Sequence, residues 1–141
     1  MRLVLDTSVL VAAFRSGSGA SRLLLEAAIG GRFVLLLSVP LMLEYESVLT
    51  RAEHLETSGL SVTEVNSVLD ALAAVGEPVR LPFHWRPILR DANDDMVLEA
   101  AVNGRADGLV TFNDRDFLPV RAEFNIRIFS PRDLIRKLEK K

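Results

Sequence analysis

Hydrophobic residues along this chain form short unbroken runs, and between these runs apolar positions recur every three or four residues. An unbroken apolar run indicates a strand buried on both faces, whereas the three-to-four spacing indicates a helix with one apolar face. The pattern predicts strands at residues 3–5, 33–37, 78–81, 108–112 and 126–129.

Polar and helix-breaking residues set the limits of the predicted helices. Ser38 can cap a helix over residues 39–50, because Pro40 is tolerated in a first turn. Ser61 and Glu64 form a capping box that opens a helix ending at Gly76. Further helices are predicted around residues 9–14, 23–29, 94–103 and from 130 onward, and residues 16–19, 52–59 and 82–93 are linker-like.

Strands that alternate with helices, and that are apolar on both faces, predict a parallel sheet covered on both sides. The expected fold is a three-layer α/β/α arrangement with a central, mainly parallel sheet. A chain of 141 residues fits one domain, so we expect a single domain over residues 1–141.

The amino-acid composition limits the kinds of functional site that the chain can form. Cysteine is absent, which excludes disulfides, thiolate metal sites and a cysteine nucleophile and suits a reducing cytoplasm. No segment resembles a signal peptide or a membrane span, so a soluble protein without membrane contact is expected. The formal net charge of -2 means that any nucleic acid must be bound by a local basic patch.

Acidic residues gather where predicted strands end. Asp6 follows the first strand, and Asn113, Asp114 and Asp116 follow the strand that contains Val110. Ligands of open parallel sheets bind beyond the carboxyl ends of the strands, so these groups can meet. Another polar group starts a helix that can reach the same edge, and its members are Asp91, Asn93, Asp94 and Asp95.

Each acid also has an ordinary structural interpretation. Asp6 can cap the helix that follows it, Asp94 and Asp95 can interact with their own helix dipole, and Asp114 and Asp116 can be solvated turn residues. If the acids converge, their mutual repulsion is costly unless a cation lies between them. Oxygen ligands without cysteine or paired histidines favour Mg²⁺ or Mn²⁺, which can activate water against a phosphodiester.

A further acid of the site is expected in the second apolar segment, but helical spacing does not decide which of two glutamates it is. Glu44 and Glu46 both stand in the apolar stretch LMLEYESVL, and periodicity does not choose between them. Either could instead be an exposed helix acid paired with a residue such as Arg51.

Three segments in this order resemble the PIN-domain nucleases, in particular VapC-type toxins. They are MRLVLDTSVLVAA, LLLSVPLMLEYESVLTR and RDANDDMVLEAAVNGRADGLVTFNDRDF, and the resemblance extends over essentially the whole chain. It implies a three-layer α/β/α fold and divalent-metal-dependent cleavage of RNA, with conserved acids as metal ligands.

The resemblance assigns the acids by position. It makes Asp6, Glu44, Asp94 and Asp116 the catalytic metal ligands, with Asn113 beside them. Asp95 competes with Asp94, because successive helix residues point about a third of a turn apart. Asp114 is an additional or substitute ligand.

The chain departs from the family pattern at Ser8, where many relatives have Asn, and at Ala92, which replaces a common Pro with little expected effect. Relatives have either Gly-Asp or Phe-Asn after the Val-Thr pair. This chain has Phe112-Asn113, so the resemblance assigns the acidic role to Asp116.

Substrate contacts are expected from polar and basic residues near these acids. We assign this role to Thr7, Ser8, Thr111, Arg15 and Arg115. Other arginines that could rim the site are Arg22, Arg51, Arg86 and Arg90. Trp85 could stack on a base but is expected to pack in the interior, and neither His54 nor His84 is expected to bind metal.

The resemblance also implies partners, namely an RNA substrate, an antitoxin protein and a second copy of the chain in a homodimer. Two alternatives stay open. One is a non-catalytic PIN-fold module that binds RNA or protein, which the residues at Ser8 and Asn113 favour. The other is a phosphatase or phospho-acceptor domain with Asp6 as nucleophile, which the absence of a second Asp two residues later disfavours.

Overall fold

The computed structural model describes residues 1–17, 19–80 and 92–140. Within these ranges the strands form one five-stranded sheet in the order β3-β2-β1-β4-β5, and every neighbouring pair is parallel. The bounds are β1 Arg2–Leu5, β2 Val34–Leu37, β3 Glu77–Pro78, β4 Gly108–Val110 and β5 Arg127–Phe129. The α/β class with a parallel central sheet is therefore confirmed.

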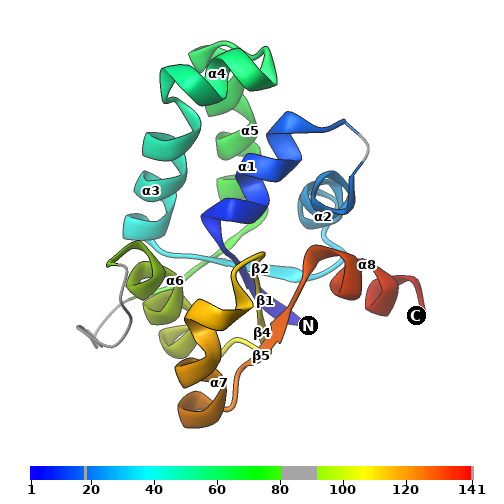
Figure 1. The fold of residues 1–141 in the computed structure, drawn as a ribbon, viewed down its shortest axis with the longest axis vertical. Helices are drawn as coiled ribbons and strands as arrows, with labels where there is room; N and C mark the ends of the chain where they lie inside the picture. The colour runs from blue at the N-terminus through cyan, green and yellow to red at the C-terminus, as the bar shows by residue number, and fades with distance from the viewer. Residues whose placement is uncertain (18, 81–91, 141) are drawn as a thin grey trace.

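Helices connect the strands and cover both faces of the sheet. Their bounds are α1 Thr7–Arg15, α2 Ala20–Ile29, α3 Val39–Leu49, α4 Ala52–Ser58, α5 Val62–Val75, α6 Ala92–Asn103, η1 Asp114–Phe117, α7 Leu118–Phe124 and α8 Pro131–Glu139. In Figure 1, α1, α2 and α5 lie above the strands, whereas α6 and α7 lie to their lower left.

The strand order explains this division of the helices. From β1 the chain moves through β2 to β3 in one direction and then returns past β1 to β4 and β5 in the other. Right-handed crossovers in opposite directions place their helices on opposite faces. The direction reverses between β1 and β4, which makes their carboxyl ends the switch point of the sheet.

The polar residues expected to start helices do so. Ser38 Oγ accepts a hydrogen bond from the Leu41 N–H at 3.2 Å. Ser61 and Glu64 form the reciprocal capping box, with both hydrogen bonds at 3.1 Å. These caps satisfy backbone N–H groups that the first helical turn leaves without partners.

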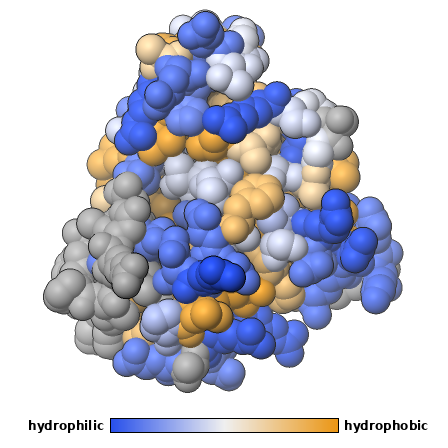
Figure 2. Space-filling model, viewed as in Figure 1, coloured by the Kyte–Doolittle hydropathy of each residue, from blue (hydrophilic) through white to orange (hydrophobic). Residues whose placement is uncertain are grey.

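The core lies between the sheet and the helix layers. Leu3, Val4, Leu35, Leu36 and Leu109 of the central strands are at most 1% exposed. Helix α8 is amphipathic and buries one side against this core while its outer surface is hydrophilic, as Figure 2 shows on the right of the molecule. Among the described residues, no helix is long and apolar enough to cross a membrane.

Two short helices were not expected from the sequence. Residues 52–59, predicted as linker-like, contain α4, which buries none of its residues and so lacks the apolar face that would reveal it. The turn after β4 continues through η1 into α7, whose end at Asn125 has a left-handed backbone with φ 54°.

β1, β2 and β5 each differ by one residue in length from the predicted strands, and β3 and β4 are each two residues shorter than predicted. β3 has two residues rather than the predicted four, and residue 81 lies outside the described residues. β4 ends at Val110, although the Thr111 N–H still donates to the Phe129 carbonyl of β5 at 3.0 Å. The predicted irregular segment at 82–93 lies outside the described residues up to residue 91, and α6 begins at Ala92.

Candidate active site

Asp6 and Thr111 lie side by side at the switch point of the sheet. They directly follow Leu5 of β1 and Val110 of β4, which are register partners. The backbone N–H of Asp6 donates to the Val110 carbonyl at 2.9 Å and so extends the pairing by one residue. The structure thus brings together two residues that are 105 positions apart in the sequence.

The Asp6 carboxylate is buried and is held by two hydroxyl groups. Its Oδ2 accepts hydrogen bonds from Thr111 Oγ1 at 2.7 Å and from Ser8 Oγ at 2.8 Å. Asp6 occupies the N-cap position of α1, yet its side chain makes no capping hydrogen bond. The ordinary interpretation of Asp6 as a helix cap therefore does not describe this structure.

The electrostatic environment of Asp6 disfavours its negative charge. Burial raises the pKa of Asp6 above its ordinary value, although hydrogen bonds from Thr111, Ser8 and the Thr7 backbone oppose this change. The negative charge of Asp116 raises the pKa further. No arginine or lysine in the described part of the chain forms an ion pair with Asp6.

The turn after β4 is tied to Asp6 by hydrogen bonds. Thr111 Oγ1 donates to Asp6 and accepts from the Asn113 N–H at 2.9 Å, and the Asn113 carbonyl accepts from the Asp116 N–H at 3.0 Å. Asn113, Asp114 and Asp116 are all exposed, and Asp116 is the turn acid whose charge acts on Asp6.

Tyr45 connects α3 to this site, and the sequence had not suggested this role. It is fully buried, and its hydroxyl donates a short hydrogen bond to the Leu5 carbonyl. Burial, together with the negative charge of Asp6, raises the pKa of Tyr45. The Tyr45 hydrogen bond thus joins α3 to the last residue of β1, directly before Asp6.

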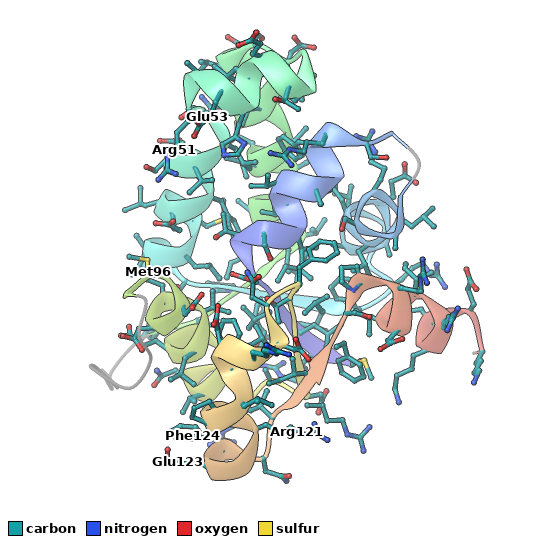
Figure 3. All side chains as sticks on the ribbon, in the orientation of Figure 1. Arg51, Glu53, Met96, Arg121, Glu123 and Phe124 are labelled. Carbon is teal, nitrogen blue, oxygen red and sulfur yellow. The ribbon has the colours of Figure 1, made fainter. Side chains whose placement is uncertain are left out.

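The structure distinguishes the two glutamates of α3. Glu44 is half-buried, on the same side of the helix as buried Leu41 and Val48, whereas Glu46 is exposed. α3 also packs against α6, and Figure 3 shows Met96 of α6 beside the first turn of α3.

The first turn of α6 carries buried acids. Asp94 is 8% exposed and Asp95 is 3% exposed, and both interact with other groups of the protein. Glu99, one helical turn beyond Asp95, is 1% exposed and also has interaction partners. Sequence reasoning missed Glu99, although an acid beside Leu98 and Ala100 in an apolar helix is a signal that could have found it.

The acids are not gathered into one cluster. Within residues 1–17, 19–80 and 92–140, no three Asp, Glu or His side chains come close enough together to hold a metal ion by themselves. The chemistry of the donor atoms nevertheless suits a hard divalent cation. Asp6 is a buried carboxylate, the negative charge of Asp116 acts on it, and no arginine or lysine of the described residues forms an ion pair with it.

A comparison with models of protein families identifies the family of this chain. The model of the PIN domain matches residues 2–115. The chain belongs to the PIN-domain family. A crystal structure of VapBC2 from Rickettsia felis, bound to a DNA fragment from their promoter, is similar with a TM-score of 0.63 and 16% identity. The match covers 92% of this chain and 98% of the other, and no curated protein matches the sequence.

The acids that the resemblance selects come from four separate elements of the fold. The residues that the resemblance selects come from the end of β1, from α3, from the start of α6 and from η1, namely Asp6, Glu44, Asp94 and Asp116. α6 packs on β1 and on α3, and η1 packs on β5.

The predicted substrate residues occupy different positions around Asp6. Thr7 and Ser8 are half-buried in the first turn of α1, while Arg15 and Arg115 are exposed. Arg22 is paired with Glu26 at 3.3 Å, and Figure 3 shows Arg51 at the end of α3 remote from α6. His54 is half-buried and 3.9 Å from Glu53. His84, Trp85, Arg86, Arg90 and Asp91 lie outside the described residues.

Proposed function

We propose that this PIN domain is a divalent-metal-dependent ribonuclease that hydrolyses RNA phosphodiester bonds. The observation that carries the proposal is Asp6, a buried carboxylate at the switch point with a second acid acting on it and no described basic partner. A divalent cation would offset the cost of this arrangement.

The proposed metal ligands are Asp6, Glu44, Asp94 and Asp116, and Asp95 and Asp114 are the alternatives at their positions. A bound Mg²⁺ or Mn²⁺ would supply an activated water and neutralise charge on the phosphate oxygens. The hydroxyls of Ser8 and Thr111 fix the orientation of the Asp6 carboxylate through the hydrogen bonds described above.

Other residues of the turn and of α1 are proposed to contact the substrate. Asn113, whose N–H is bound by Thr111 Oγ1, is placed to orient a ligand or a water. We assign phosphate contacts to the exposed guanidinium groups of Arg15 and Arg115 and polar contacts to Thr7, Ser8 and Thr111.

The biological setting is proposed from the similar structure. Because that structure is a VapBC2 complex, we propose that this chain is a cytoplasmic toxin restrained by an antitoxin protein and that it forms a homodimer. We also propose that residues 1–141 form a single PIN domain.

One observation favours a second candidate, a PIN-fold module that binds RNA or protein without cleaving it. In the part of the chain that the structure describes, the acids do not form a group of three able to hold a metal. An RNA-binding protein that never cuts with Mg²⁺ or Mn²⁺ would match this candidate.

The Asp6→Asn variant tests the nuclease proposal. The amide keeps the shape of the carboxyl but removes its charge, so Mg²⁺-dependent RNA cleavage should fall at least about 100-fold, the scale of losing a preorganised catalytic group. Cleavage of a labelled RNA pool is followed on gels, with and without a chelator.

The matched control is Asp70→Asn, the same change at an exposed residue of α5. This variant should cleave like the unchanged chain. Equal cleavage by the Asp6→Asn variant, or cleavage that survives the chelator, would exclude the proposed metal chemistry.

A further inference from the structure

Tyr45 of α3 carries a hydroxyl group that core packing alone does not require. The residue is 0% exposed, at a position where a phenylalanine ring would fill nearly the same space. Burying a hydroxyl group is costly unless the hydroxyl forms a hydrogen bond. The Tyr45 hydroxyl donates to the carbonyl of Leu5, the residue directly before Asp6. It therefore acts on the backbone of the proposed active site.

The Leu5 carbonyl and the Asp6 N–H belong to one peptide group, and both are hydrogen-bonded. The Asp6 N–H donates to the Val110 carbonyl at 2.9 Å, while the Leu5 carbonyl accepts from Tyr45. A peptide group is planar and turns as one rigid unit. Hydrogen bonds to β4 on one side and to α3 on the other therefore fix the orientation of the plane that leads into Asp6.

The pairing of β1 with β2 does not replace this hydrogen bond. The register pairs between these strands end at Leu3 and Leu35, two residues before Leu5. Leu5 is 1% exposed, so water has little access to it. Removing the Tyr45 hydroxyl would leave a buried carbonyl that regains a partner only if the peptide group turns or water enters.

The position of the Asp6 carboxylate depends on this backbone. Ser8 and Thr111 hold the carboxylate at 2.8 and 2.7 Å, and these hydrogen bonds keep their geometry only if the Asp6 Cα stays in place. Burial raises the pKa of Tyr45, and the negative charge of Asp6 raises it further, so the two groups also interact electrostatically. A displacement of about 1 Å at a catalytic group can lower a rate about 100-fold.

We propose that Tyr45 is a positioning residue for Asp6: its hydroxyl fixes the peptide group between Leu5 and Asp6, and thereby the direction in which the Asp6 carboxylate faces a bound cation. Tyr45 acts through the backbone and contacts neither the metal nor the RNA. This inference rests on the proposed function, because it takes Asp6 as a ligand of the divalent metal.

The Tyr45→Phe variant tests the inference, because it removes the hydroxyl and keeps the ring. Calorimetric titration of the metal-free variant should show an affinity for Mn²⁺ about tenfold below that of the unchanged chain, the lower end of the range for groups that orient metal ligands. Circular dichroism checks that the variant is folded.

The matched control is Ile135→Val. It deletes one methylene group from a buried residue of α8, a helix that packs on α2 and β5. It should lower the stability of the chain as the loss of a buried hydrogen bond does, yet leave the affinity for Mn²⁺ unchanged.

Amide hydrogen exchange separates positioning from a general loss of stability, and it needs no metal. A purely structural role of Tyr45 would speed exchange alike at all amides that exchange through global unfolding. Positioning predicts that Tyr45→Phe speeds exchange of the Asp6 amide about fivefold more than that of the Leu109 amide, the scale of one lost hydrogen bond. In Ile135→Val the two amides should change alike.

The outcomes separate this inference from the nuclease proposal. If Tyr45→Phe matches Ile135→Val in both measurements while the unchanged chain binds Mn²⁺ and cuts RNA, the inference is overturned and the nuclease proposal stands. In a chain that binds Mn²⁺, either effect without the other also overturns the inference, because the loosened backbone and the weaker site must occur together. If the unchanged chain binds no Mn²⁺, the nuclease proposal fails, and exchange of the Asp6 amide alone decides whether Tyr45 positions Asp6.

Discussion

At the scale of single residues, Asp6 holds an unfavourable charge in an ordered position. Two hydroxyl groups orient it at 2.7 and 2.8 Å, while burial and the charge of Asp116 raise its pKa. Hydrogen bonds alone would suffice to stabilise a structural aspartate. The additional carboxylate acting on Asp6 is what points to a cation.

The raised pKa of Asp6 predicts a pH dependence of stability in metal-free buffer. The folded state holds the Asp6 proton more tightly than the unfolded state, so stability falls as pH rises from the ordinary value of 3.8 through the raised value. The Asp6→Asn variant lacks this loss. Its stability relative to the unchanged chain should therefore increase over this pH range and level off above it, as measured by urea unfolding.

Asp70→Asn serves as the control here too, because Asp70 is exposed. Its stability difference from the unchanged chain, measured over the same pH range, gives the effect of an Asp→Asn change at an exposed position and is subtracted from that of Asp6→Asn. A difference for Asp6→Asn that shrinks as pH rises would show that the charged form of Asp6 is favoured by folding.

The sequence could predict some residues of the site and not others. Asp6 and the turn acids were found because they follow apolar runs. Periodicity left Glu44 and Glu46 open and the resemblance selected Glu44; the structure adds that Glu44 is half-buried and Glu46 exposed, which depends on long-range packing of α3. Tyr45 was missed because a buried tyrosine in an apolar helix reads as core, and its hydrogen bond to β1 is long-range.

At the scale of elements, the strands and capped helices were predictable because each has a local signal. α4 and α7 had none. α4 buries nothing, and α7 continues directly from the turn acids, so its short span was read as part of a loop. Short helices of this kind form through the connections at their ends rather than through an apolar face of their own.

The end of α6 allows a direct test of helix packing on the sheet. A Cβ at Gly104 would lie 2.7 Å from the Ala100 carbonyl oxygen and 2.9 Å from both Leu36 and Val79 side chains. Gly104→Ala should therefore lower the free energy of unfolding by about 1–3 kcal/mol, the usual cost of overpacking. Urea unfolding measures the change.

Gly17→Ala is the matched control, because a Cβ at Gly17 would meet no atom within 4 Å. It should leave stability nearly unchanged. Equal stability of the two variants would mean that α6 can shift away from the sheet at no cost.

At the scale of the whole molecule, the strand order creates the site. β1 and β4 are neighbours although most of the chain separates them, and the direction of the chain reverses between them. The sequence predicted that acids at strand ends could meet on one edge of a parallel sheet. It could not predict which strands are neighbours, because strand order depends on long-range packing of the helices.

The central claim is that the acids around Asp6 hold a divalent cation, and binding of Mn²⁺ tests it without knowledge of the RNA target. Calorimetric titration of the metal-free chain should show Mn²⁺ binding that is lost in Asp6→Asn and retained in Asp70→Asn. Mn²⁺ binding of equal strength in the Asp6→Asn variant would contradict the claim.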